Sequence, residues 1–255
     1  MRFDTLAVER RDGICRVRFD RPEADNAIDS SMVAELGAML SLCEHGEAGQ
    51  EPVRILILEG SPTAFCVGGD LQAFAAAERP SDPEPLYDVW LRMARGPFVT
   101  ISVVRGRVNA GGVGIVSASD IVLADRSASF SLSELLFGLY PACVMPFLMR
   151  RIGEQRAHYL TLTTRAFGAE EAASWGLVDA LDDDVAALLR KHLLRLKLLS
   201  RPAIARYKRY TAQLVDQLER SKALALDANR EMFGDPDTQR AIRRYVTESK
   251  FPWEP

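Results

Sequence analysis

The chain has few of the residues that build disulfide frameworks and metal sites. Its 255 residues include four cysteines, Cys15, Cys43, Cys66 and Cys143, with neither a CxxC pair nor regular spacing, and three histidines that lie far apart. In a chain without a secretion signal, this usage is typical of reduced thiols in a cytoplasmic protein. The histidines have no ligand-like spacing, so we expect no metal site.

Long apolar runs and a strong charge of one sign are also missing. No stretch approaches the ~18 apolar residues of a membrane span, and the opening MRFDTLAVERRDG lacks the apolar segment of a secretion signal. The formal net charge is −3, from 32 Lys and Arg against 35 Asp and Glu. This balance gives no overall attraction for nucleic acid or an anionic membrane, so we expect a cytoplasmic protein that uses neither as a partner.

The first half of the chain alternates short apolar runs with helical patterns. ICRVRF alternates apolar and polar residues after the turn RRDG, and VRILILEG, FVTISVVRG and DIVLAD have the length of buried strands. Between them, SSMVAELGAMLSLCEH has apolar residues at helical spacing, with Ser30 as its expected N-cap. Strands and helices that alternate at this spacing predict an α/β core.

Helical patterns replace the strands from about Pro146 onward, and the last of them, RPAIARYKRY to DANREMF, is long. We therefore predict an α/β core over residues 1–195 and a C-terminal helical region over 196–255. The one Pro-rich interruption, AERPSDPEP at 77–85, follows the first of two glycine pairs. It is either a loop beside a site or an exposed insertion without a role.

Two glycine pairs each follow an apolar strand and open a helix. The first lies in AFCVGGDL and the second in NAGGVGIVSAS, and neither fits the GxxxxGK[ST] or GxGxxG patterns that bind nucleotides. Either pair alone could be a tight packing turn. Together, two such turns can direct two backbone N–H groups at one carbonyl oxygen, an oxyanion hole worth ~3–4 kcal/mol per donor when charge develops there.

The order of these segments resembles the crotonase (enoyl-CoA hydratase/isomerase) superfamily. The motifs are DRPEADNAIDSSMVAEL, AFCVGGDL, VRGRVNAGGVGIVSASDIVLAD, SFSLSELLFGLYP and AEEAASWGLVDAL, and they cover nearly the whole chain. The resemblance implies a spiral of ββα turns with C-terminal helices that build homotrimers, often paired into hexamers. It also implies thioester substrates whose enolate is held by the backbone N–H groups of Gly69 and Gly111.

Hydratases of this superfamily place two glutamates against the substrate, and only one is found here. The second aligns with Glu134 in SLSELLFG, whereas the position of the first is Gly114. One base suffices to remove an acidic proton α to a thioester, so Glu134 is the expected catalytic residue and ordinary hydration of enoyl thioesters is disfavoured. A glutamate placed at position 114 is expected to raise that hydration if the pocket is otherwise a hydratase's. Asp70 is a weaker candidate, and helix capping is its favoured role.

A narrower resemblance is to the crotonase-type dehydratases of polyketide β-branching cassettes, and the segment GLYPACVMPFL carries it most clearly. It implies dehydration of 3-hydroxy-3-methylglutaryl-acyl carrier protein to 3-methylglutaconyl-acyl carrier protein. The acyl group would be carried on the phosphopantetheine of the carrier protein, or on CoA, with no other cofactor. The substrate's free carboxylate requires a cation, and Arg79, Arg92 and Arg95 are candidates. Cys66 and Cys143 lie in the same motifs, but without a histidine partner they are interpreted as packing residues.

Two other functions stay open at this point. The first is a CoA-thioester hydratase, isomerase or decarboxylase of the same superfamily. The second is a superfamily member without catalytic activity that acts as a binding module. The presence of Glu134 together with Gly69 and Gly111 argues against the second, because a degenerate site has no reason to keep all three.

Overall fold

The structure, a computed structural model, describes residues 3–46 and 51–254. The described residues form a larger sheet in the order β1-β2-β3-β5-β7-β10 and a smaller sheet in the order β4-β6-β8-β9. The strands are β1 (Leu6–Arg11), β2 (Ile14–Phe19), β3 (Ile55–Glu59), β4 (Ala64–Cys66), β5 (Val99–Val104), β6 (Arg107–Asn109), β7 (Ile121–Ala124), β8 (Ser129–Ser131), β9 (Phe167–Gly168) and β10 (Ala180–Leu181).

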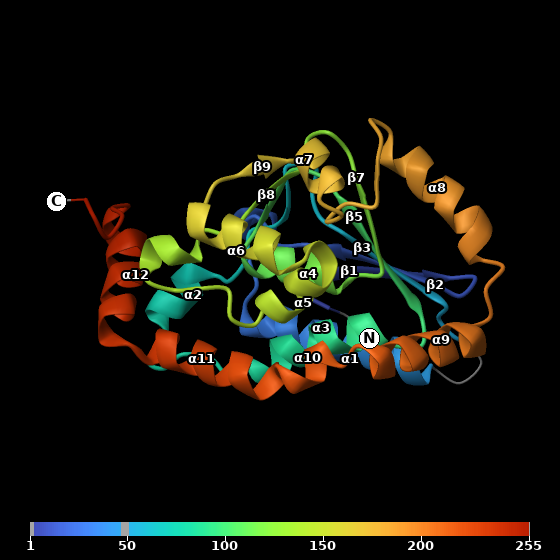
Figure 1. Ribbon diagram of the computed structural model, residues 1–255, viewed down its shortest axis with the longest axis horizontal. Coiled ribbons are helices and arrows are strands. Elements are labelled where there is room, and N and C mark those ends of the chain that lie inside the picture. Colours follow the sequence, from blue (N-terminus) through green and yellow to red (C-terminus); the bar gives the residue numbers. More distant parts are fainter. Residues whose placement is uncertain (1–2, 47–50, 255) are drawn as a thin grey trace.

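Helices surround both sheets. They are η1 (Pro22–Ala24), α1 (Ser30–His45), α2 (Leu71–Ala76), α3 (Glu84–Arg95), α4 (Gly111–Ala118), η2 (Glu134–Phe137), α5 (Met145–Ile152), α6 (Glu154–Thr163), α7 (Ala169–Ser174), α8 (Val185–Leu196), α9 (Arg201–Leu214), α10 (Gln217–Arg220), α11 (Lys222–Gly234) and α12 (Pro236–Glu248). Figure 1 shows α1, α3, α10 and α11 along one side of the molecule, α8 on the opposite side, and α12 beside α2 near the C-terminal end. The predicted α/β class is confirmed.

The larger sheet separates two layers of the core. In β3, Leu56 and Leu58 pack into the main core, whereas Ile55 and Ile57 face a second cluster that includes residues of α8 and α9. Alternate residues of a strand point to opposite faces, so a strand covered on both faces is apolar throughout. The apolar run of β3 is unbroken because both faces of this strand are covered.

The predicted hairpin is present at the edge of this sheet. β1 and β2 pair antiparallel from Leu6↔Phe19 to Arg11↔Ile14. Their two-residue turn has Asp12 at φ 54° and Gly13 at φ 73°. Two consecutive residues with positive φ are typical of a hairpin turn whose twist matches that of the strands, and Asp-Gly suits such a turn.

Three details differ from the sequence predictions. Helix α1 begins at Ser30, but its N-cap is Asp29, whose side chain accepts a hydrogen bond from Met32 N at 2.8 Å. Strands also continue beyond Pro146, because β9 pairs with β8 and β10 pairs with β7. Both have only two residues, too few for a periodic pattern to appear.

The third difference is in the long C-terminal pattern, which is broken into α9, α10 and α11. The first break lies at Val215 and Asp216, whose backbone angles are not helical. Asp216 in this break and Glu219 beyond it both accept hydrogen bonds from Arg95 of α3, at 2.9 Å each. Contacts with another helix thus direct the chain where local pattern alone predicts continuation. The predicted division at residue 195 falls in the last turn of α8 and stays a prediction.

The C-terminal helices close one end of the molecule. A third apolar cluster joins Met232 of α11 and Ile242 of α12 to Phe137 of η2 and to Leu71 and Phe74 of α2. Helix α12 thereby packs against two segments that lie far earlier in the chain (Figure 1). None of the described helices has the length and apolar character that a membrane span requires.

Candidate active site

The smaller sheet brings the predicted site residues to one edge. Strands β4, β6 and β8 are parallel neighbours, paired through Ala64↔Arg107 and Asn109↔Ser131 among others. The C-terminal ends of parallel strands meet at the same edge, where ligand sites of α/β proteins commonly form. Gly69 follows β4, Gly111 follows β6 and Glu134 follows β8. The three segments therefore leave the sheet together.

The first glycine pair is held by a single bridge to the chain before α1. Ile28 N donates to Gly68 O at 2.7 Å, and Asp70 N donates to Ile28 O at 2.9 Å, so that Gly69 bridges Ile28 in parallel. Peptide groups alternate in direction along extended backbone, so the N–H of Gly69 itself points away from Ile28. Among the described residues, this N–H has no hydrogen-bond partner.

The second pair forms the first turn of α4. Gly111 is the first residue of the helix, where an N–H has no partner within the helix. None of the hydrogen bonds of the described residues uses this N–H, whereas Ala110 N donates to Ser131 O at 3.1 Å. Ala110 has φ 48° and ψ −116°, a conformation that residues with a side chain rarely adopt and that costs ~1–3 kcal/mol. The surrounding contacts therefore force the turn into this shape.

The two unpartnered N–H groups lie side by side. A Cβ built on Gly68 would be 3.2 Å from Gly111 N, and one built on Gly111 would be 3.9 Å from Gly69 N. On Gly69, by contrast, a Cβ would meet nothing within 4 Å. The absent side chains thus bring the two turns together and leave open space beside Gly69. This arrangement can hold one small anionic oxygen with two donors.

Glu134 is the carboxylate at this edge. Its Oε2 is fully buried and has no hydrogen-bond partner among the described residues. Burial, opposed in part by a hydrogen bond from its own backbone N–H, raises the pKa of Glu134 to about 7. A carboxyl group with a pKa near neutrality can both accept and return a proton at physiological pH. An unpaired buried carboxylate oxygen costs stability, which is typical of a functional rather than a structural group.

Asp70 has a structural position. It is the N-cap of α2, where its Oδ1 accepts from Ala73 N at 2.9 Å, and its Oδ2 accepts from Arg21 Nη2 at 3.0 Å. Arg21 also contacts Asp29 Oδ2 at 3.2 Å. Both oxygens of Asp70 are therefore occupied, and the capping role favoured from sequence accounts for them.

The space for a second glutamate is filled. A Cβ at Gly114 would lie 2.5 Å from the Trp90 ring, and Trp90 is 1% exposed in the core. A glutamate at this position cannot be accommodated without displacing a packed indole. We therefore expect a glutamate at position 114 to disturb the packing of Trp90, and the prediction that it raises hydration in a hydratase-like pocket stays a prediction.

Two of the three candidate arginines have other partners. Arg92 donates to both oxygens of Glu44 and to Gly37 O, and Arg95 bonds α10. Arg79 is exposed in the segment between α2 and α3 and has no partner among the described residues. Arg79 is thus the only one of the three that has no polar contact to give up before binding a carboxylate.

The cysteines do not form a nucleophilic site. Cys66 and Cys143 are buried, and burial raises the pKa of each thiol to about 12. Protonated thiols are poor nucleophiles. This supports the interpretation of both residues as packing groups. The described residues contain no group of three or more His, Cys, Asp or Glu placed to hold a metal ion.

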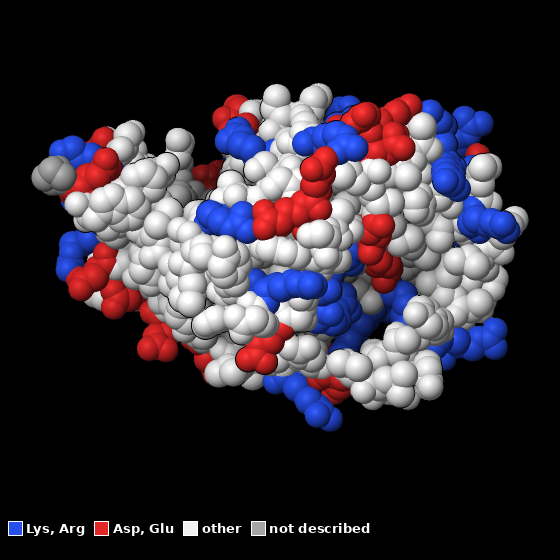
Figure 2. Space-filling view, turned by 45° about the horizontal axis from the view of Figure 1, so that its top comes forward, with Lys and Arg blue, Asp and Glu red and all other residues white. Residues whose placement is uncertain are grey.

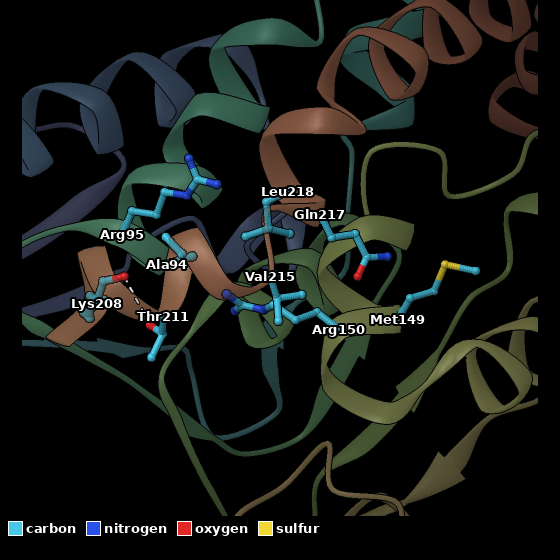
Figure 3. Close-up of a pocket in the computed structure, with 10 residues that line it drawn as sticks. Ala94, Arg95, Met149, Arg150, Lys208, Thr211, Val215, Gln217 and Leu218 are labelled. Carbon is cyan, nitrogen blue, oxygen red and sulfur yellow. Dashed lines mark hydrogen bonds between the residues drawn. The ribbon is translucent and has the colours of Figure 1, made fainter.

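A cavity of about 410 Å³ lies elsewhere, between α3, α5, α9 and α10 (Figure 3). Arg95, Arg150 and Lys208 are among its lining residues, and none of the glycines or Glu134 is. Lys208 is already engaged by Asp120 Oδ2 at 2.8 Å. On the surface, Figure 2 shows basic and acidic side chains interspersed over most of one face, with Lys and Arg gathered around a hollow.

The fold and the edge site define a class of protein. Residues 9–255 match the enoyl-CoA hydratase/isomerase family, and the chain belongs to it. Along its full length the chain is similar to the bacillaene synthase dehydratase PksH of Bacillus subtilis (strain 168), with 50% identity over 257 residues, 99% of this chain and 97% of PksH. A crystal structure of PksH from Bacillus subtilis superposes with a TM-score of 0.94 at 49% identity, covering 98% of this chain and 100% of that one.

More distant relatives have other activities. The 1,2-epoxyphenylacetyl-CoA isomerase of Escherichia coli (strain K12) is 31% identical over 211 residues, 76% of each chain. The similarity to PksH is therefore much stronger than the similarity that the family shares in general. The predicted superfamily, its fold, and the narrower resemblance to a polyketide dehydratase are confirmed by these comparisons.

Sequence reasoning missed one part of the site. Asn109, the last residue of β6, contacts Ser131 and Ser133 through its side chain, at 2.9–3.3 Å. Nothing in the sequence indicates that these three polar residues meet, because their contact depends on the register between β6 and β8.

Proposed function

We propose that this protein is a dehydratase of polyketide biosynthesis that converts 3-hydroxy-3-methylglutaryl-acyl carrier protein to 3-methylglutaconyl-acyl carrier protein. The full-length similarity to PksH, a dehydratase by name, supports the reaction class. The observation that carries the assignment is the site itself. One unpaired buried carboxylate stands at the same sheet edge as two free N–H groups, and Trp90 fills the position of a second carboxylate.

The reaction needs only these groups. Glu134 as carboxylate removes the proton from the α-carbon of the thioester, and the negative charge moves to the carbonyl oxygen between the N–H groups of Gly69 and Gly111. The electrons of the enolate then form the Cα–Cβ double bond as the Cβ–O bond breaks. The leaving hydroxyl takes the proton from Glu134 and departs as water, which restores the carboxylate. Nothing is oxidised or reduced.

The carrier of the acyl group follows from the same similarity. We infer that an acyl carrier protein presents the substrate on its phosphopantetheine. Arg79 is the candidate cation for the free carboxylate because it is exposed near the first glycine turn and unpaired among the described residues. A CoA-thioester hydratase, isomerase or decarboxylase is the alternative.

We also propose that the protein assembles as a homotrimer, alone or paired into a hexamer. Large apolar side chains are exposed along the C-terminal helices, including Leu194, Leu198, Tyr207, Leu214 and Leu224 at 63–76% exposure. Exposed apolar residues in such number mark an association surface, and closed cyclic symmetry buries them equally in every subunit. Sedimentation that shows a stable monomer at micromolar concentration contradicts this proposal.

Mass spectrometry of the loaded carrier protein tests the function directly. The enzyme is incubated with 3-hydroxy-3-methylglutaryl carrier protein, and the acyl-phosphopantetheine fragment is expected to lose the mass of water. The matched CoA thioester is run in parallel. No loss from the carrier-bound substrate, together with rapid turnover of CoA thioesters, would support the alternative.

A further inference from the structure

A polar side-chain cluster ties the second glycine turn to the segment that carries Glu134. Asn109 Nδ2 donates to Ser133 Oγ at 2.9 Å, and Asn109 Oδ1 accepts from Ser131 Oγ at 3.0 Å. Ser133 Oγ also lies 3.3 Å from Asn109 Oδ1. All three residues are partly buried. The amide thus uses one end on the last residue of β8 and the other on the N-cap residue of η2.

The positions of these residues in the chain give the cluster its meaning. Asn109 lies two residues before Gly111, and Ser133 lies directly before Glu134. The backbone adds a parallel tie, since Ala110 N donates to Ser131 O at 3.1 Å. Beyond these bonds, Ser133 is the N-cap of η2 without a capping hydrogen bond from its side chain. The hydroxyl of Ser133 therefore forms hydrogen bonds with Asn109 instead of capping its own helix.

Glu134 is held by few polar contacts. Its own backbone N–H donates to the carboxylate, whereas Oε2 has no hydrogen-bond partner among the described residues, so the direction of that oxygen depends on how η2 leaves β8. The position of a base relative to an oxyanion donor must be fixed to within a fraction of an ångström, because misplacement by ~1 Å can cost ~10²-fold in rate. The contact nearest to Glu134 in this cluster is the bond from Asn109 to Ser133.

We propose that Asn109 is a positioning residue that, through Ser133, sets the Glu134 carboxylate relative to the Gly111 N–H. This inference rests on the proposed function only in so far as Glu134 is the base. It assigns no direct contact between Asn109 and the substrate. Asn109 acts as a strut between the two halves of the site.

The test removes the amide without changing its shape. Asn109→Leu has a similar branched outline and neither donates nor accepts hydrogen bonds. We expect kcat to fall about 10- to 100-fold with KM within about threefold, because transition-state geometry is lost and substrate binding is kept. Ser133→Ala, which deletes one hydroxyl, should reproduce most of this loss, and Ser133→Thr, which keeps the hydroxyl, should restore activity.

Two further variants separate a strut from a general stabilising contact. Ser102→Ala on β5 removes a buried side-chain hydrogen bond to Ser119 Oγ (2.8 Å), outside this cluster, and its kcat should stay within about threefold of wild type. In a double-mutant cycle, Asn109→Leu and Ser133→Ala should be non-additive, with the double variant no slower than the slower single variant. Additive losses would show that Asn109 does not act through Ser133, and would overturn the proposal.

A readout without substrate makes the result independent of the reaction assigned. The protonated carboxyl band of Glu134 can be titrated by infrared difference spectroscopy, with Glu134→Gln as the blank. Without the hydrogen bond between Asn109 and Ser133 the carboxyl can turn toward water, so its pKa should fall from about 7 in Asn109→Leu and Ser133→Ala but not in Ser102→Ala. An unchanged pKa in both variants with intact fold overturns the proposal even if the protein is a dehydratase. If the pKa of Glu134 falls in these variants but the protein dehydrates none of the substrates, the proposed function is contradicted and the positioning role of Asn109 is supported.

Discussion

The two glycine turns present the same group, a free N–H, but are supported in opposite ways. The first is followed by the short, partly exposed helix α2, whose cap Asp70 is bonded to Arg21. The second begins the buried helix α4, which has no side-chain cap. Around it, a Cβ on Gly112 would lie 2.1 Å from Cys66 O, and Ala110 is held at φ 48°.

The first turn is supported by an ion pair and a helix cap, whereas the second is supported by close packing. Open space beside Gly69 leaves this one position of the first turn free to carry a side chain without harm to the fold, whereas a Cβ on Gly68 would lie 2.7 Å from Ala110 Cβ. In the second turn and the helix that follows it, Gly112 and Gly114 have no room for a Cβ, which would lie 2.1 Å from Cys66 O and 2.5 Å from the Trp90 ring. Substitutions at the two turns should therefore separate activity from stability, and the following predictions are ordered by expected effect.

The largest effect is expected from substituting Glu134, the proposed base. Glu134→Gln keeps the shape of the side chain but cannot accept the α-proton, so turnover should fall at least ~10²-fold with fold and assembly unchanged. Rates are measured with the loaded carrier protein, and circular dichroism checks the fold. Turnover within a few-fold of wild type in a stable variant would remove Glu134 from the mechanism.

The substitution Gly114→Glu tests the packing of the second turn. Because the Trp90 ring stands 2.5 Å from the Cβ position, we expect a loss of folding stability of about 1–3 kcal/mol or more and no gain in crotonyl-CoA hydration. Chemical denaturation and a hydration assay measure the two outcomes. Gly114→Glu combined with Trp90→Ala is the matched variant with room for the side chain. A single variant that is stable and hydrates crotonyl-CoA would refute the steric account.

Gly69→Ala should give the opposite result. Its added methyl meets no protein atom within 4 Å, but under the proposed function it would lie where the thioester approaches the N–H. We expect kcat/KM to fall about 10- to 100-fold, with a melting temperature within about 2 °C of wild type. A variant as active as wild type would show that the N–H of Gly69 does not contact the substrate.

The buried carboxyl of Glu134 should also appear in the pH dependence of stability. Its pKa is raised from 4.5 to about 7, so the folded state favours the protonated form. This contribution is fully present below pH 4.5 and is lost as the pH rises through about 7. Glu134→Gln, which stays neutral, should therefore be more stable than wild type at pH 8 by about 1–3 kcal/mol, with a difference that shrinks at lower pH. A difference in stability between Glu134→Gln and wild type that is the same at pH 8 and at lower pH contradicts the raised pKa of Glu134.

The smallest effect is expected from the charges that support the first turn. Asp70→Ala removes the cap of α2 and the partner of Arg21, which should cost about 1 kcal/mol of stability. Activity should fall only a few-fold, through fraying of α2. Asp70→Asn keeps the capping oxygen and should recover most of the stability in urea denaturation. A loss of activity as large as that of Glu134→Gln would instead give Asp70 a chemical role.

The placement of the candidate site residues at one sheet edge could be predicted from sequence because they lie in motifs with a fixed order, whereas their catalytic roles stay a prediction. Gly69, Gly111 and Glu134 each follow a short strand, and the structure brings those strands together. The division of the strands into two sheets could not be predicted. Strands of three residues, such as β4 and β6, carry no periodic signal that separates a second sheet from the first.

What the sequence did not predict depends on contacts between distant segments. The bond from Asn109 to Ser133 requires the register of β6 against β8, and the Trp90 ring behind Gly114 requires the packing of α3 on α4. Asp29 rather than Ser30 caps α1, because neighbouring residues of similar capping propensity differ only in backbone conformation. Each of these is decided by tertiary structure.

The apolar contact of α12 with α2 and η2 has a consequence for biosynthesis. A ribosome completes both glycine turns and Glu134 long before it makes Ile242, whose side chain is fully buried among the residues that flank them. Contacts between such distant segments form late in folding, because the intervening chain must first be ordered. The nascent chain therefore carries all three candidate site residues before the helix that packs beside them has been made. We therefore expect catalytic activity to require α12. A chain that ends before α12 should form its sheets but be inactive.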